Sequence, residues 1–161
     1  LGKPVWPCPY NENRLRHIYV SESSGKYTSQ SVLDPYSLTH VSHGILLFYI
    51  LYLLHDFQTY SSMIYIAIIY EVLWEIIENT PFIIRRYREQ STQSREYHGD
   101  SIVNSLGDIF SMTLGFFLAW TFPRYGILCF IFNEMILSHT IGDNLLTNIY
   151  QLFIKPLVKF S

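Results

Sequence analysis

Alanine, cysteine and charged residues are all scarce in this sequence of 161 residues. Alanine occurs only as Ala67 and Ala119, whereas there are 19 isoleucines, 13 tyrosines and 11 phenylalanines. Charged residues account for 15%, well below the roughly 25% of a typical soluble domain. The composition therefore favours a membrane protein, and the net charge of −2 argues against a nucleic-acid partner. The two cysteines, Cys8 and Cys129, match no zinc or redox spacing and do not indicate a disulfide.

Four apolar stretches, separated by polar connections, follow a polar N-terminal segment. Each stretch has 17 to 25 residues, and about 17–25 residues of helix are needed to cross a bilayer. Lipid offers no partner for backbone polar groups, so a spanning segment must be helical. We therefore predict an all-α integral membrane bundle of four transmembrane helices; the alternative is a water-soluble helical bundle. The four predicted helices cover residues 36–54, 60–84, 101–122 and 125–141.

The same pattern divides the chain into three parts and gives them a side of the membrane. Residues 1–35 form a predicted extramembrane arm, 36–143 the transmembrane domain, and 144–161 an amphipathic helix lying in the interface and interrupted near Pro156. Ten of the eleven lysines and arginines lie in the arm, the 85–100 connection or the C-terminal segment, and only Arg124 lies on the opposite side. This asymmetry predicts that both termini face the cytoplasm, or the matrix of a mitochondrion.

Acids, amides and histidines recur inside the apolar stretches. The glutamates of the second stretch fall within a wedge of about 60° on one helical face. At a rise of about 1.5 Å per residue, His43, Glu78, Asp108 and Glu134 lie roughly 9–11 Å deep, and Glu71 lies beyond the midplane. Such groups are costly in lipid, so we expect them to face one another inside the bundle. The candidate polar pocket comprises His40, His43, Glu71, Glu75, Glu78, Asn79, Asp100, Asn104, Asp108, Asp143 and Asn144.

Two interpretations of this pocket stay open. The groups could be a satisfied hydrogen-bond network that holds the helices together. They could equally form a functional pocket that acts on lipid head groups, relays protons or binds a metal. No nucleophile elbow, phosphate loop, zincin motif or paired Glu-x-x-His signature is present, so no catalytic residue is assigned, no metal site is firmly predicted and the cofactor is unknown, with bound phospholipid as one candidate.

Three arginines, Arg85, Arg86 and Arg88, close the second stretch. They are candidates for binding an anionic lipid head group. The alternative is that they only contribute to the charge asymmetry that orients the chain.

Several motifs together are similar to those of a known family. They resemble an uncharacterised alphaproteobacterial inner-membrane family, catalogued as a domain of unknown function, over residues 6–152; a fainter likeness is to VanZ-like membrane proteins. The resemblance implies a small multi-span protein and supplies no activity. It rests on Asp34-x-Tyr36-x-x-x-His40-x-x-His43-Gly44, Glu71-x-x-Trp74-Glu75-x-x-Glu78-Asn79-x-Pro81, Tyr97-x-Gly99-Asp100-Ser101-x-x-Asn104-Ser105-x-x-Asp108 and Asp143-Asn144-Leu145.

These observations support two functional hypotheses. The first is a structural accessory subunit of a larger inner-membrane assembly, such as a mitochondrial respiratory-chain complex. It follows from the small size, the missing catalytic signature and the polar arm of 35 residues, which a protein partner would hold in place. It predicts lipids and other protein subunits as partners, and a residue usage typical of A/T-rich genomes favours a mitochondrion. The second is a membrane-embedded enzyme or transporter that uses the candidate polar pocket. Both place the protein in an inner membrane, mitochondrial or bacterial.

Overall fold

The computed structural model describes residues 18–25, 27–54, 59–90 and 95–155, and these residues are helical apart from the connections. Within these ranges there is no β-strand, only an isolated parallel bridge between Tyr19 and Leu33. The all-α class is therefore confirmed. The elements are α1 (Ser37–Leu53), α2 (Tyr60–Glu78), α3 (Pro81–Gln90), α4 (Ile102–Thr121), α5 (Gly126–Thr140), α6 (Leu145–Ile149) and a π-helical turn, η3 (Tyr150–Ile154).

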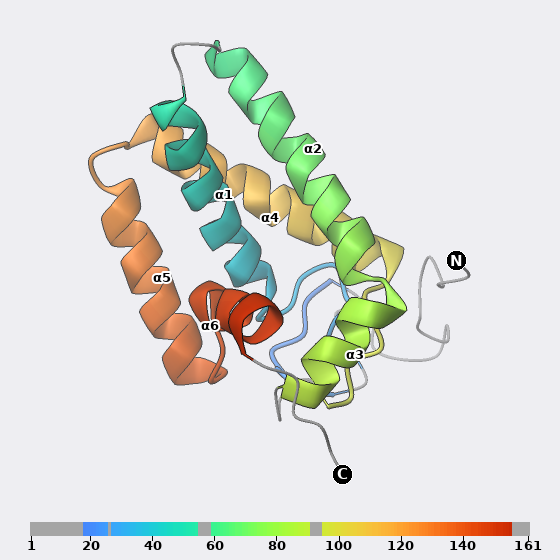
Figure 1. Cartoon of the computed structure of the whole chain (residues 1–161). Coiled ribbons are helices and arrows are strands. Elements are labelled where there is room, and N and C mark those ends of the chain that lie inside the picture. The colour runs from blue at the N-terminus through green and yellow to red at the C-terminus, as the bar shows by residue number, and fades with distance from the viewer. Residues whose placement is uncertain (1–17, 26, 55–58, 91–94, 156–161) are drawn as a thin grey trace.

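Helices α1 and α4 form the centre of the bundle, with α2 and α5 flanking them (Figure 1). Two glycines allow the backbones of α1 and α4 to lie close together. A Cβ atom on Gly44 would lie 1.9 Å from the carbonyl oxygen of Met112, and one on Gly115 would lie 2.1 Å from that of Val41. Small residues at such crossings let helix backbones touch, a device that membrane bundles share.

The apolar core lies beyond this crossing, between α1, α2 and α4. Phe48 and Phe116 meet edge to face there, with ring centroids 5.5 Å apart. This arrangement of two aromatic rings is a favoured one. The other buried members of the core are Ile45, Leu51, Met63, Ala67, Met112 and Ala119.

Three of the four predicted apolar helices are found close to their predicted limits, and the second is shorter than predicted. The predicted helix at 60–84 ends at Glu78, and a separate helix, α3, begins at Pro81. The cause is Pro81, because proline disfavours the helical conformation of the residue before it but is well suited to the first position of a helix. Asn79 and Thr80 therefore form a break between α2 and α3.

The described part of the N-terminal arm packs against the bundle. Its backbone and side chains bond to the start of α4: the Ser101 N–H donates to the Ser29 carbonyl at 2.9 Å, and the Asn104 amide donates to the Ser31 carbonyl at 2.9 Å. A Cβ on Gly107 would lie 1.7 Å from the Val32 carbonyl oxygen, so this contact is also backbone against helix. Cys8 and the rest of residues 1–17 lie outside the described residues, as does Pro156.

By length and composition, α4 is the one helix among the described residues that is long and apolar enough to cross a membrane. Helices α1 and α5 are apolar but have 17 and 15 residues. Helix α2 has 19 residues but carries three glutamates. The arrangement of four transmembrane helices accordingly stays a prediction.

Candidate functional site

A cavity of about 740 Å³ opens between α1, α2, the arm and the C-terminal helices. Seven of the eleven predicted pocket residues line it, and they come from α1, α2, α4, the segment before α4 and the turn after α5. Glu71, Glu75, Asn79 and Asn144 do not line it. The polar lining includes His40, His43, Glu78, Asp100, Asn104, Asp108 and Asp143. The apolar lining includes Leu46, Leu47, Ile50, Trp74, Leu152 and Phe153. The cavity thus combines ionisable groups with an apolar surface large enough for a hydrocarbon chain.

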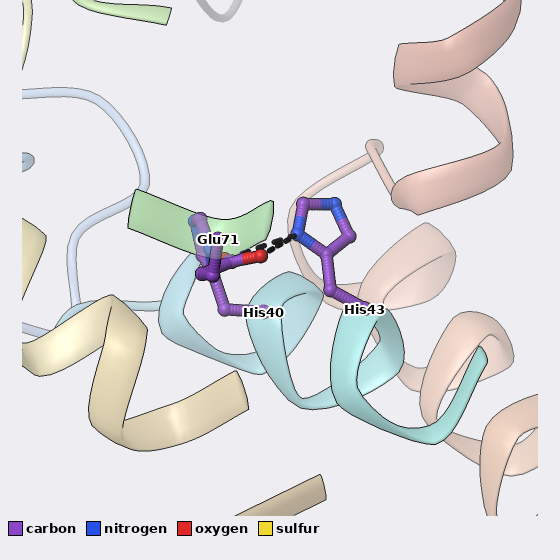
Figure 2. A group of neighbouring side chains, drawn as sticks. All are labelled: His40, His43 and Glu71. Atoms are coloured by element: carbon purple, nitrogen blue, oxygen red, sulfur yellow. Dashed lines mark hydrogen bonds and ion pairs between the residues drawn. The ribbon is translucent and has the colours of Figure 1, made fainter. Parts of the chain in front are cut away.

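His40 and His43, which line the cavity, form a cluster with Glu71, the His–Glu cluster (Figure 2). The two histidines are three residues apart on α1, which places both rings on one helical face. Both turn Nδ1 toward the Glu71 carboxylate: His40 contacts Oε1, and His43 lies 3.2 Å from each oxygen. The ring centroids of the two histidines are 4.9 Å apart, and Trp74 meets His43 edge-on at 6.2 Å. Glu71 itself is fully buried.

Counting helical rise from residue 84 predicted that Glu71 lies beyond the midplane, at a different level from His43. The structure instead brings Glu71 into contact with His43. Helix α2 ends at Glu78, not at residue 84, so the count began from the wrong end residue. The depth of these groups in a membrane stays a prediction.

Two further carboxylates approach His40. Glu75 is buried, with Oε1 3.7 Å from Nδ1 of His40, and neither of its carboxylate oxygens has a hydrogen-bond partner among the described residues. Asp108 faces the other side of the ring, with Oδ2 3.9 Å from Nε2. The Ser37 hydroxyl donates to Oδ1 of Asp108 at 2.8 Å and fixes that carboxylate. Ser37 was not among the predicted pocket residues, although its position one helical turn before His40 places it on the same face.

A second group of polar side chains joins the break between α2 and α3 to the start of α4. Asn79 donates to Oδ2 of Asp100 at 2.9 Å, and the Asp100 N–H donates to Oδ1 of Asn79 at 2.7 Å. Burial, reinforced by the carboxylates of Asp100 and Glu78, raises the pKa of the Tyr97 hydroxyl, which stays protonated and donates to Asp100 at 2.6 Å. Burial and Glu78 raise the pKa of Tyr87 in the same way. Neither tyrosine was predicted, although Tyr97 stands three residues before Asp100.

Other polar groups hold elements together away from the cavity. Glu134 on α5 accepts a hydrogen bond from the Ser42 hydroxyl at 2.8 Å and one from the Leu146 N–H at 3.1 Å, which joins α1, α5 and α6. Asn144, a predicted pocket residue, instead caps α6 by accepting from the Thr147 N–H at 2.8 Å. Some of the predicted polar residues therefore hold helices together, as the alternative interpretation of the pocket proposed.

The three arginines of α3 have different environments. Arg86 is buried, and its guanidinium donates to the carbonyls of Leu152, at 3.1 Å, and Lys155. It therefore fixes the C-terminal helix to α3. Arg85 and Arg88 are exposed, and Arg88 donates to the Arg95 carbonyl at 3.0 Å. The proposed lipid head-group contact stays a prediction for these two.

Asp143 gives the cavity a predictable pH dependence. Burial raises its pKa to about 6, with a contribution from Glu134, against the N–H of Asn144 that bonds to it at 2.9 Å. Because the pKa in the folded state lies above that of the unfolded chain, about 3.9, protonation of Asp143 stabilises the fold. That contribution is complete below the unfolded pKa and is lost as the pH rises through about 6.

Asp143→Asn should therefore raise the free energy of unfolding relative to the unsubstituted protein by about 2–3 kcal/mol at pH 8 and by much less at pH 4.5. Thermal unfolding of the detergent-solubilised protein at both pH values measures this difference. Glu96→Gln, at an exposed acid, is the control and should show no such pH dependence. If the stability difference between Asp143→Asn and the unsubstituted protein were smaller at pH 8 than at pH 4.5, the raised pKa of Asp143 would be contradicted.

The fold and the site define a class: an all-α protein with many exposed large apolar side chains and a cavity lined by histidines and carboxylates. The chain belongs to the family described as protein of unknown function DUF2585, which matches residues 2–159. It is 38% identical to a UPF0314 protein of Rhizobium meliloti over 92% of this chain and 74% of that protein. It is 40% identical to one of Sinorhizobium fredii, with the same coverage, and 35% identical to one of Paracoccus denitrificans, over 84% and 70%. No solved structure matches the chain significantly.

These findings confirm the predicted resemblance to an uncharacterised alphaproteobacterial family. The relatives are bacterial proteins, and their names state no activity, ligand or partner.

Proposed function

We propose that this protein is a membrane-embedded enzyme that admits an amphipathic molecule to its cavity and acts on the polar end of that molecule. One observation carries the proposal: a single cavity of about 740 Å³ combines His40, His43 and Asp108 with an apolar lining that includes Leu47 and Phe153. A pocket for a wholly polar ligand would not need the apolar lining, and a network serving only to join helices would not need the cavity.

The proposal places α1, α2, α4 and α5 across the bilayer. Large apolar side chains are exposed along the two flanking helices, as lipid contact requires: Tyr65, Ile69, Leu73 and Ile76 on α2, and Leu128, Phe132 and Met135 on α5. The arm, α3 and the C-terminal helices gather at one end of the bundle (Figure 1). Five of the six lysines and arginines among the described residues lie on or beside these elements, all except Arg124, so this end would face the cytoplasm or matrix. The cavity opens among these elements, where head groups are found.

The chemistry available is hydrolysis or group transfer at the linkage between a head group and its apolar part. The polar lining supplies imidazole and carboxylate groups, the side chains that most often assist such reactions. Trp74 packs edge-on against His43, and the Glu71 carboxylate accepts from its ring, so the imidazole is held between two neighbours. A positioned imidazole beside an apolar channel is what an enzyme for a lipid-like substrate requires.

The accessory-subunit hypothesis has less support from the described residues. It predicted that a partner holds the arm, but Gln30, Ser29 and Ser31 are held by hydrogen bonds to residues 99–104 of the same chain. A role in a mitochondrial respiratory complex stays a prediction. Purification in mild detergent followed by identification of stoichiometric partners tests it, and migration as a monomer would contradict it.

The enzyme proposal is tested by placing the purified protein in proteoliposomes made from the total lipid extract of an alphaproteobacterium. Lipid composition is followed over time by mass spectrometry. The unsubstituted protein should convert at least one lipid class, and His43→Asn should reduce that rate by about 100-fold or more, as loss of a positioned catalytic imidazole does. His139→Asn is the matched control, because His139 is exposed on α5 and does not line the cavity.

Thermal unfolding of all three proteins shows whether each is folded. An unchanged lipid profile with folded, unsubstituted protein would overturn the proposal. Equal conversion by His43→Asn and the unsubstituted protein would overturn the assignment of the cavity.

A further inference from the structure

We infer that His40, His43 and Glu71 bind a divalent transition-metal ion, with zinc the best fit. This goes beyond the proposed function, because the ion would be bound whether or not the cavity admits a lipid. The three residues each offer a ligand atom, and these atoms all lie within 4.8 Å of one another. Two imidazoles and one carboxylate form a donor set typical of zinc sites that keep an open coordination position.

The spacing of His43 and Glu71 matches such a site, whereas His40 is hydrogen-bonded to Glu71 and would have to move back to admit an ion. Bond lengths of about 2.0–2.2 Å in a tetrahedral arrangement separate two ligand atoms by about 3.3–3.5 Å. Nδ1 of His43 lies 3.2 Å from each Glu71 oxygen, and Nδ1 of His40 contacts Oε1 of the same carboxylate. Figure 2 shows the His43 ring turned toward the Glu71 carboxylate, with His40 beside Glu71. A small ion between these atoms requires only local adjustment of side chains.

The charges favour a cation at this position. Glu75 is 5% exposed, and neither of its oxygens has a hydrogen-bond partner in the part of the chain that the structure describes. A buried carboxylate without such partners is costly unless a proton or a cation neutralises it. Its Oε1 lies 3.7 Å from the ligand atom of His40, close enough to offset the charge of the ion without binding it. One divalent ion would balance the charges of Glu71 and Glu75 together.

The surroundings of His40 also suit metal binding. Metal-bound histidines commonly direct their second ring nitrogen at a carboxylate, which fixes the tautomer and the orientation of the ring. Nε2 of His40 faces Asp108 at 3.9 Å, and the Ser37 hydroxyl holds Asp108 in place. His40 and His43 line the cavity, so a substrate could reach an open coordination position from there. With an ion bound, His43 would act as its ligand and not as a proton acceptor, and the ion would supply a Lewis acid at the polar lining.

A second set of possible ligands shares His40 but uses Glu75 and Glu78. It offers one imidazole and two carboxylates, a donor set better suited to harder ions such as manganese. We assign zinc to the set with two imidazoles, because imidazole nitrogen is a preferred zinc ligand. The two assignments differ in whether His43 or Glu78 is required, which allows an experiment to separate them.

The test is to remove metal from the purified full-length protein with a chelator, titrate it with zinc chloride alone, and measure bound zinc by elemental analysis. The unsubstituted protein should bind one zinc ion per chain. His43→Asn and Glu71→Gln should bind at least about 10-fold more weakly, and Asp108→Asn about 10- to 100-fold more weakly, as loss of an outer-shell partner does. His139→Asn, Glu89→Gln and Glu78→Gln should bind zinc as the unsubstituted protein does.

A second measurement does not depend on whether the variants fold. Chelation should lower the unfolding temperature of the unsubstituted protein, and zinc should restore it, because an ion that binds only the folded state stabilises it. Absence of stoichiometric zinc before and after titration would overturn the inference, in favour of a hydrogen-bonded His–Glu–His arrangement. Loss of zinc in Glu78→Gln but not in His43→Asn would overturn the assigned ligands.

The outcomes also separate this inference from the enzyme proposal. Lipid conversion by a protein that binds no zinc would remove the metal site and leave the enzyme. Zinc binding without any lipid conversion would do the reverse.

Discussion

Gly115→Ala is expected to lower the stability of the bundle by about 2–4 kcal/mol, and Gly115→Leu to prevent folding. In an ordinary helix interior, glycine to alanine is stabilising by about 0.5–1 kcal/mol, so the predicted sign is the opposite of the default. The reason is that a Cβ at this position would lie 2.1 Å from the carbonyl oxygen of Val41 and 2.8 Å from its carbonyl carbon. Those atoms are backbone of α1 and cannot move aside as a side chain would.

The whole of α1 would have to shift away from α4. That shift would also separate Gly44 from Met112 on the other half of the crossing and loosen the Phe48–Phe116 contact. Thermal unfolding in detergent or nanodiscs measures the effect. Leu114→Phe, an enlargement at the next residue on an exposed position, serves as the control and should change little. A higher unfolding temperature for Gly115→Ala would contradict the close packing of α1 on α4.

The second large effect is a contrast between two buried glutamates. Glu71→Gln should reduce lipid conversion by about 100-fold or more, whereas Glu134→Gln should leave the rate unchanged. Glu71 lies between the Nδ1 atoms of His40 and His43 and sets the orientation of both rings. Glutamine has one acceptor oxygen in place of two and no charge, so it cannot hold both imidazoles or support a metal ion.

Glu134, by contrast, contacts Ser42 and the first turn of α6, and it does not line the cavity. Its replacement by glutamine should lower the unfolding free energy by about 1–3 kcal/mol, because a charge-assisted bond to the α6 backbone is lost. Conversion rates and unfolding temperatures measured on the same preparations give both numbers. Equal loss of activity in the two variants would show that both acids act only by stabilising the fold.

The comparison between the predicted and observed site is most informative for α2. The sequence identified Glu71, Glu75 and Glu78 as one helical face and His40 and His43 as another, because side-chain periodicity in a helix is fixed. It did not identify which glutamate meets the histidines, because that depends on where α2 ends and on how it crosses α1. Pro81 indicates that α2 ends before it, but the apolar residues on both sides of Pro81 led to the prediction of one continuous helix.

Arg86 shows a second limit of prediction from the sequence. As one of three nearby arginines it looked like part of a charged surface, and only the position of the C-terminal helix shows that its guanidinium binds the carbonyls of that helix. Likewise, Asn144 was predicted as a pocket residue, but in the structure it caps α6. In each case the sequence showed a polar side chain that needs a partner. It could not show which partner, because the partner is distant in the sequence.

The sequence by itself determined the helical class, the limits of α1, α4 and α5, the family and the set of polar groups that face inward. These follow from hydrophobic periodicity, from helix-ending residues and from motifs that act locally along the chain. Only the tertiary structure decided the break between α2 and α3, the meeting of His43 with Glu71, the division of the acids between cavity and glue, and the cavity itself. These depend on how the helices cross, which is set by backbone contact at Gly44 and Gly115 between residues far apart in the sequence.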